Sequence, residues 1–165
     1  MGGITMSGSL HIKLVLVILI TISHGSSTCG DSPGKVDVKV MNSLEAGKDL
    51  TCHCKSKDRD FGVKNIPFDQ IYDCSFHDPD GKMTISCNMQ WESSTRRKTS
   101  GTFTIYGTTK YLGRCPGICA WMVQENGLCY YDRFTSKWIY VYGWNDDGKS
   151  NTTCKGNIPF PTSLN

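Results

Sequence analysis

The sequence carries little excess charge and only one long hydrophobic run, and these two absences exclude two classes of protein. Its 165 residues contain 18 lysines and arginines against 15 aspartates and glutamates, a formal net charge of +3. Nucleic-acid-binding domains concentrate a much larger basic excess on one face, so we expect no nucleic-acid partner. Beyond the run near the N-terminus, no apolar segment approaches the roughly 20 residues of a membrane-spanning helix. We therefore expect no stable membrane insertion of the mature chain.

The one hydrophobic run, Leu14–Ile22, has the flanks of a secretory signal peptide. Lys13 precedes it, and the small residues Ser23 and Gly25 follow at the spacing of a cleavage site. The sequence therefore predicts a signal peptide over residues 1–25 and a short N-terminal extension over 26–35. The mature protein is expected to be secreted and extracellular.

Nine cysteines are more than a cytosolic protein of this length normally carries. In a secreted chain they indicate a disulfide-stabilised fold, in which each bridge typically adds about 2–4 kcal/mol. Because nine is odd, at least one thiol is unpaired or bonds to another molecule. We expect a monomer, with a disulfide dimer through the odd cysteine as the alternative. The disulfide candidates are Cys29, Cys52, Cys54, Cys74, Cys87, Cys115, Cys119, Cys129 and Cys154.

The mature chain lacks helical periodicity and instead alternates β-forming residues between turn signals. Asn126-Gly127 splits one segment into a hairpin, and Asp78–Gly81 is a second clear turn. The pattern predicts an all-β fold, a small antiparallel β-sandwich of seven to eight strands. The expected strands are Val36–Met41, Leu50–Lys55, Gln70–Phe76, Met83–Trp91, Thr102–Tyr106, Cys119–Val123 with Leu128–Tyr131, and Lys137–Tyr142.

Alternation along these strands also predicts a core. Leu50, Cys52 and Cys54 share one face of their strand, while His53 lies on the opposite face. The same reasoning puts Tyr72, Cys74 and Phe76 on one face. The strand-borne tryptophans Trp91, Trp121 and Trp138 are expected to anchor the packing.

Five motifs, in this order and spacing behind a signal peptide, resemble the plant self-incompatibility protein S1 family, the S-protein homologues. The first is a strand ending in HCKSKDRDFG, close to the family's HCKSKDDDLG. The others resemble its Tyr-x-x-Ser-Phe strand, its Cys-x-x-x-Trp strand, its RCxxCxW and Gly-x-Cys signature, and its closing Tyr-Pro-Trp-Asn. The matching segments are His53–Gly62, Tyr72–Phe76, Cys87–Trp91, Arg114–Trp121 with Gly127–Cys129, and Tyr142–Asn145.

The resemblance implies one S-protein-homologue β-sandwich domain over residues 36–145, followed by a polar tail over 146–165. It also implies a secreted ligand that binds a cell-surface receptor, as the stigma-secreted founding members do in pollen recognition. The chain departs from the family before Arg114, where acidic groups are missing and Lys110 is the only charge after Phe103. That hydrophilic loop is tied to activity in the founding members, so the departure concerns the partner and not the scaffold.

The cysteines divide into family-like positions and additions. Cys52 and Cys74 are additions on neighbouring predicted strands, each with an inward direction, and we predict a bridge between them. Cys29 and Cys154 are also additions, and they flank the domain where they are placed to tie its ends together. The family-like cysteines are Cys54, Cys87, Cys115, Cys119 and Cys129, whose pairing the sequence leaves open.

Three chemical sites were weighed against these structural roles. A zinc site at Cys52-His53-Cys54 has the wrong spacing, and an oxidising compartment favours disulfides. A Cys–His catalytic pair needs a reduced, low-pKa thiol beside an imidazole, and His53 points away from its neighbours. Asp58 and Asp60 lie in alternating charge, without the Gly-centred loop of a calcium site. We therefore predict no enzyme activity, catalytic residues, metal or cofactor.

The candidate recognition surface is instead formed by charged loops, because loops on a rigid sandwich usually carry recognition. The first hypothesis is a secreted plant signalling ligand. The alternative is a secreted defence or toxin-like protein acting on microbes or membranes, and an extracellular enzyme ranks third. The tail also carries one glycosylation sequon at Asn151. The candidate partner-binding residues are Lys55, Lys57, Asp58, Arg59, Asp60, Arg96, Arg97, Lys98 and Lys110.

Overall fold

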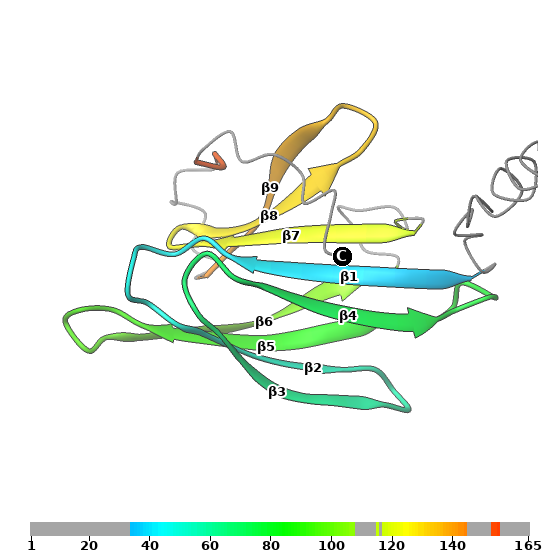
Figure 1. Ribbon diagram of the computed structural model, residues 1–165, viewed down its shortest axis with the longest axis horizontal. Coiled ribbons are helices and arrows are strands. Elements are labelled where there is room, and N and C mark those ends of the chain that lie inside the picture. Colours follow the sequence, from blue (N-terminus) through cyan, green and yellow to red (C-terminus); the bar gives the residue numbers. More distant parts are fainter. Residues whose placement is uncertain (1–33, 108–114, 116, 145–152, 156–165) are drawn as a thin grey trace, which may run out of the picture. The chain divides into compact units, whose positions relative to one another are not determined.

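The computed structural model describes residues 34–107, 115, 117–144 and 153–155, which form nine strands in two sheets. One sheet has five strands in the order β4-β1-β7-β8-β9, and the other has four in the order β3-β2-β5-β6 (Figure 1). The strands are β1 (Lys35–Asn42), β2 (Leu50–Lys55), β3 (Asp60–Ile66), β4 (Ile71–His77), β5 (Ile85–Glu92), β6 (Lys98–Tyr106), β7 (Ile118–Gln124), β8 (Gly127–Asp132) and β9 (Lys137–Gly143).

The all-β prediction is confirmed, with two corrections to its detail. The described residues form nine strands, not seven to eight, because no strand was predicted over β3, which follows the predicted charged loop Lys55–Asp60. β3 is an edge strand with mostly exposed side chains, so it lacks the apolar alternation that reveals a half-buried strand. The second correction is that β1 and β7 pair in parallel, whereas the other strand pairs are antiparallel.

The main hydrophobic core lies between the two sheets. The predicted inward face of β2 is confirmed, because Leu50, Cys52 and Cys54 are all buried. Phe76 and Cys74 of β4 are also buried, and Tyr72 packs against them from the rim. Trp121 is fully buried, whereas Trp91 and Trp138 are half-buried, so only one of the three predicted anchors lies at the centre.

One buried polar side chain ties the sheets together at the end of β1. Asn42 is fully buried, and its amide nitrogen donates to the carbonyls of Lys48 (2.9 Å) and Ile66 (2.8 Å). Its side-chain oxygen accepts from the amide of Leu44 at 3.0 Å. Because a buried polar group costs free energy unless it is paired, these bonds fix where β1, its following loop and β3 meet.

Among the described residues, no helix is long and apolar enough to cross a membrane. The predicted signal peptide, residues 26–33 of the predicted N-terminal extension, Cys29, Lys110 and Asn151 lie outside the described residues, whereas Lys35 already begins β1.

Candidate functional site

The turn between β2 and β3 carries five of the predicted recognition residues and has a defined conformation. The amide of Ser56 donates to the carbonyl of Arg59 at 2.8 Å, and the amide of Arg59 donates to the hydroxyl of Ser56 at 3.0 Å. These two bonds close the turn around Lys57 and Asp58, both of which are exposed. The guanidinium of Arg59 lies 4.8 Å from the ring centre of Phe61. The turn therefore holds its charges in fixed positions before any partner binds.

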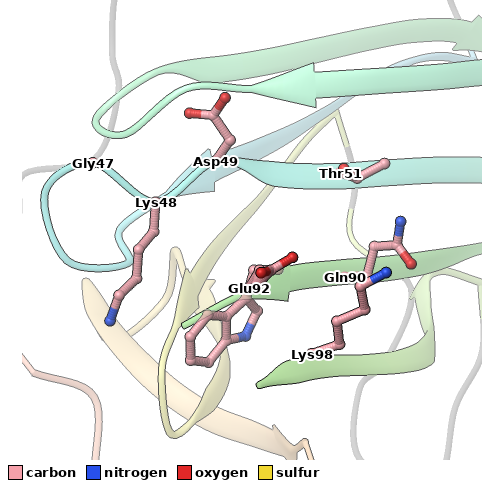
Figure 2. A pocket seen from close by; sticks show the side chains of 8 residues that line it. Gly47, Lys48, Asp49, Thr51, Gln90, Glu92 and Lys98 are labelled. Atoms are coloured by element: carbon pink, nitrogen blue, oxygen red, sulfur yellow. The ribbon is translucent and has the colours of Figure 1, made fainter. Parts of the chain in front are cut away.

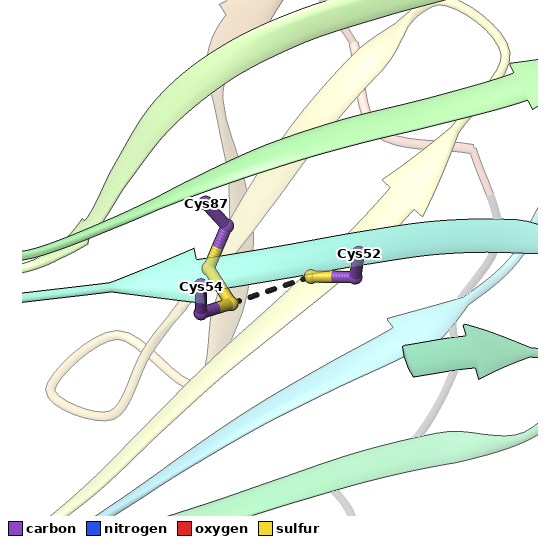
Figure 3. A group of neighbouring side chains, drawn as sticks. All are labelled: Cys52, Cys54 and Cys87. Atoms are coloured by element: carbon purple, nitrogen blue, oxygen red, sulfur yellow. Dashed lines mark hydrogen bonds between the residues drawn. A yellow bond between two sulfur atoms is a disulfide. The ribbon is translucent and has the colours of Figure 1, made fainter. Parts of the chain in front are cut away.

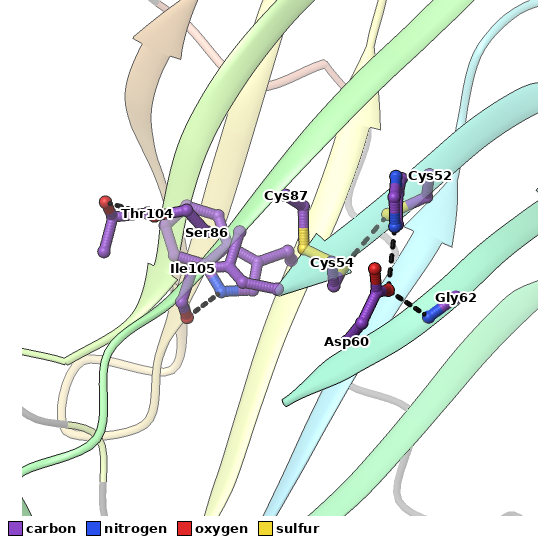
Figure 4. Close-up of a disulfide and its surroundings, with 10 residues drawn as sticks. Cys52, Cys54, Asp60, Gly62, Ser86, Cys87, Thr104 and Ile105 are labelled. Atoms are coloured by element: carbon purple, nitrogen blue, oxygen red, sulfur yellow. Dashed lines mark hydrogen bonds and ion pairs between the residues drawn. A yellow bond between two sulfur atoms is a disulfide. The ribbon is translucent and has the colours of Figure 1, made fainter. Parts of the chain in front are cut away.

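Asp60 is the anchor of this turn. Its carboxylate accepts from the amide of Gly62 and from Nε2 of His53, each at 2.8 Å, and it lies 3.2 Å from Nζ of Lys55 (Figure 4). His53 must be the donor, because an ionised carboxylate only accepts. The Gly62 amide, followed by His53, lowers the pKa of Asp60 to about 2. Asp60 is thus negatively charged at neutral and mildly acidic pH.

Three buried sulfur atoms, from Cys52 and Cys54 of β2 and Cys87 of β5, lie within 4.8 Å of one another (Figure 3). Cys54 forms a disulfide with Cys87, directly opposite it on β5, with Cα atoms 4.0 Å apart. The thiol sulfur of Cys52 lies 3.4 Å from the sulfur of Cys54. A zinc site needs several thiolates, and the disulfide leaves this cluster with one thiol. The arrangement stabilises the core and does not suit a metal ion.

The structure corrects two of the predicted cysteine pairings. Cys52 and Cys74 are free, buried thiols, so the predicted bridge between them is wrong. Their strands, β2 and β4, belong to different sheets and are not neighbours. Cys154 pairs with Cys129, so it does not tie the chain ends through Cys29. The third disulfide joins Cys115 and Cys119.

The two free thiols are expected to be unreactive in the folded protein. Burial, with a smaller contribution from neighbouring Cys74, raises the pKa of Cys52 to about 12. Burial also raises the pKa of Cys74. Because the thiolate is the nucleophile, iodoacetamide at pH 8 should leave both residues unmodified until guanidinium unfolds the chain. Peptide mapping by mass spectrometry checks this, and alkylation of either residue in the native protein would contradict it.

The second predicted loop is shorter than expected. β6 begins at Lys98, so the β5–β6 turn spans Ser93–Arg97 and Lys98 lies in a strand, opposite Glu92. The amide of Arg96 donates to the carbonyl of Ser93 at 2.8 Å, and the amide of Ser93 donates to the carbonyl of Arg97 at 2.9 Å. Arg96 adopts a left-handed conformation with φ 59°. These contacts hold two exposed arginines at the tip of a stiff hairpin.

The described residues of the predicted loops contribute to two different grooves, and neither groove is lined by Arg96 or Arg97. The first groove, with a volume of about 380 Å³, lies beside Trp91 and includes Lys98 (Figure 2). Its charges, Lys48 and Lys98 against Asp49 and Glu92, balance. The second, of about 670 Å³, is lined by residues of the β2–β3 turn together with the segment between β4 and β5. Recognition therefore has at least two faces available.

One exposed element escaped the sequence analysis, namely the turn between β8 and β9. Phe134 at its tip is 93% exposed, more than any other large hydrophobic residue among those described. The signal in the sequence was an aromatic residue inside the polar turn Asp132–Ser136. Ordinary turn rules treat such a segment only as a connection between two strands.

The known proteins most informative for this chain are S-protein homologues. Residues 37–144 match the family model for plant self-incompatibility protein S1. S-protein homolog 7 of Arabidopsis thaliana is 31% identical, covering 79% of this chain and 96% of the relative. Self-incompatibility protein S1 of Papaver rhoeas is 27% identical, covering 78% of this chain and 89% of the relative.

A solved structure is also similar, although at low sequence identity. It is described as a self-incompatibility protein homologue from "a widespread family of small, highly stable, secreted proteins from plants". The TM-score is 0.47 at 16% identity, and the match covers 68% of this chain and 91% of that one. The family match and the relatives confirm both the resemblance noted in the sequence and the extracellular location. The chain belongs to the plant self-incompatibility protein S1 family of secreted S-protein homologues.

Proposed function

We propose that this protein is a secreted signalling ligand that binds a cell-surface receptor through its charged turns and performs no chemistry of its own. The observation that carries the proposal is the preformed β2–β3 turn, in which Asp60 is bonded to His53, Gly62 and Lys55. A partner that binds a turn already held in place does not have to offset its ordering entropy. The relative from Papaver rhoeas, a self-incompatibility protein, supports a role in recognition.

The cationic β5–β6 turn is proposed to guide association with an acidic receptor surface. Arg96 and Arg97 are both exposed and lie at the tip of the hairpin. Opposite charges across an interface mainly accelerate encounter, and the effect weakens as salt screens it. Lys98 is left native in the test, because reversing it would set a like charge directly opposite Glu92.

Reversing both arginines, Arg96→Glu with Arg97→Glu, is expected to slow association with the receptor by roughly tenfold at low salt. The probe is plasma-membrane vesicles from a tissue whose extracellular fluid contains the protein, located by immunoblots of stigma, ovule, root and leaf fluid. The rate at which the protein associates with these vesicles is measured by surface plasmon resonance at two salt concentrations.

The matched control reverses two exposed lysines elsewhere, Lys35→Glu with Lys64→Glu, which changes the net charge equally. If both double variants slow association alike, total charge and not the β5–β6 turn guides binding. If the wild-type protein shows no saturable binding to any of these membranes, the ligand proposal is wrong. Growth inhibition of microbes by the purified protein would favour the defence hypothesis instead.

A further inference from the structure

The β8–β9 turn is braced from within and does not behave as a loose connection. One carboxylate oxygen of Asp132 accepts from the amide of Phe134 at 3.0 Å, and the other accepts from the hydroxyl of Thr135 at 2.6 Å. Ser136 completes the turn in a left-handed conformation with φ 54°. At the base of the hairpin, the rings of Tyr131 and Trp138 meet edge to face at 5.2 Å. The tip is therefore held in one conformation.

This rigid tip presents an exposed apolar side chain in a turn that also carries two exposed cations. Phe134 is 93% exposed, and its neighbours Arg133 and Lys137 are exposed as well. Ile139, on β9, adds a second exposed apolar side chain at 43%. Figure 1 shows the β8–β9 hairpin projecting away from the neighbouring strands of its sheet.

We propose that the tip of the β8–β9 hairpin is a docking element, which inserts Phe134 into an apolar pocket rimmed by carboxylates on a partner protein. The proposal rests on the proposed function and names the surface that makes the contact. A rigid aromatic side chain that becomes fully desolvated is the typical centre of a binding hot spot, and flanking arginine is common in such sites. Bracing by Asp132 means that little conformational entropy is lost when the ring docks.

The small size of the apolar tip favours a protein over a lipid surface as the occupant. A single 14-carbon acyl chain already gives only marginal, reversible membrane binding. One phenyl ring beside two cations buries less apolar surface than such a chain, so lipid alone would hold the tip weakly. A pocket encloses the whole ring, and acidic groups on its rim would be attracted to the exposed Lys137.

The test compares Phe134→Ala with Phe68→Ala in equilibrium binding of the labelled full mature protein. Phe68 is the matched control, because it is the other exposed phenylalanine among the described residues, at 42%, and lies outside the hairpin. The probes are native plasma-membrane vesicles, the same vesicles after trypsin treatment, and protein-free vesicles of phosphatidylcholine with phosphatidylserine. Thermal unfolding of each variant verifies that the fold is unchanged, as expected for exposed positions.

We expect saturable binding of wild type to native vesicles, at least tenfold weaker binding of Phe134→Ala, and less than a twofold change for Phe68→Ala. Trypsin treatment should abolish the binding. If Phe134→Ala binds as tightly as wild type does, the docking proposal is wrong while the ligand function stands. If protein-free vesicles bind as tightly as native ones, the occupant is lipid and the proposal of a protein partner is wrong. Absence of any wild-type binding would overturn the ligand function and the docking proposal together.

Discussion

Replacing Trp121 by alanine is expected to lower the free energy of unfolding by about 3–5 kcal/mol. Trp121 is 1% exposed in the middle of β7, and its ring stacks on Tyr142 at 5.8 Å and contacts Tyr130 at 5.3 Å. Its indole nitrogen donates to the carbonyl of Ile105 at 2.8 Å, from one sheet to the other. The substitution therefore leaves a large cavity and an unpaired buried carbonyl in the same place.

The loss is large compared with the roughly 5–15 kcal/mol by which folded domains are stable. Guanidinium titration followed by circular dichroism measures this loss of stability. It appears as a lower denaturant concentration at the unfolding midpoint, while the dependence of the unfolding free energy on denaturant is unchanged. Trp121→Phe keeps much of the apolar ring but removes the indole N–H that donates to Ile105. It should therefore lower the free energy of unfolding by roughly 1–3 kcal/mol. Trp138→Ala is the control, because that ring is half-buried and should cost less. Equal losses for Trp121→Ala and Trp138→Ala would contradict the central role of Trp121.

Removing the Cys54–Cys87 disulfide by replacing both residues with alanine is expected to cost about 3–4 kcal/mol. The bridge joins residues 33 apart in sequence, and the loss of unfolded-chain entropy that a bridge imposes grows with the loop that it closes. Both cysteines are buried between β2 and β5. Both must be replaced, because a remaining Cys87 thiol would lie near Cys52 and could form a substitute bridge.

The Cys115–Cys119 disulfide provides a matched comparison within the same chain. It joins residues only 4 apart, so its replacement by two alanines should cost about 2 kcal/mol. Thermal and guanidinium unfolding of the two double variants, without reductant, gives the difference directly. A Cys115–Cys119 variant that is less stable than the Cys54–Cys87 variant would show that loop length does not govern the disulfides of this fold.

Local patterns predicted those elements whose side chains alternate between core and solvent. β2 is the clearest case, because Leu50–Lys55 has the predicted bounds and the predicted inward face. The hairpin between β7 and β8 was predicted from Asn126-Gly127, but its two-residue turn is Glu125-Asn126 and Gly127 already begins β8. The family was recognisable because its motifs keep their order and spacing along the chain. Each of these features is decided by residues close together in sequence.

Contacts between residues far apart in sequence could not be predicted in this way. β3 is an exposed edge strand, which pairs through its backbone with β2 and needs no apolar pattern. The partner of Cys54 depends on the register of β2 against β5, and the placement of Cys52 and Cys74 depends on the assignment of β2 and β4 to different sheets.

The sequence by itself determined that the protein is a secreted, cysteine-rich, all-β member of its family, because composition, the order of the family motifs and alternation can be read along the chain. Only the tertiary structure decided which cysteines pair, which loops share a face, and that Phe134 projects into solvent. The physical reason is that exposure and pairing are set by the strands that pack around a residue. A phenylalanine in a turn has the same local sequence whether a neighbouring strand covers it or not.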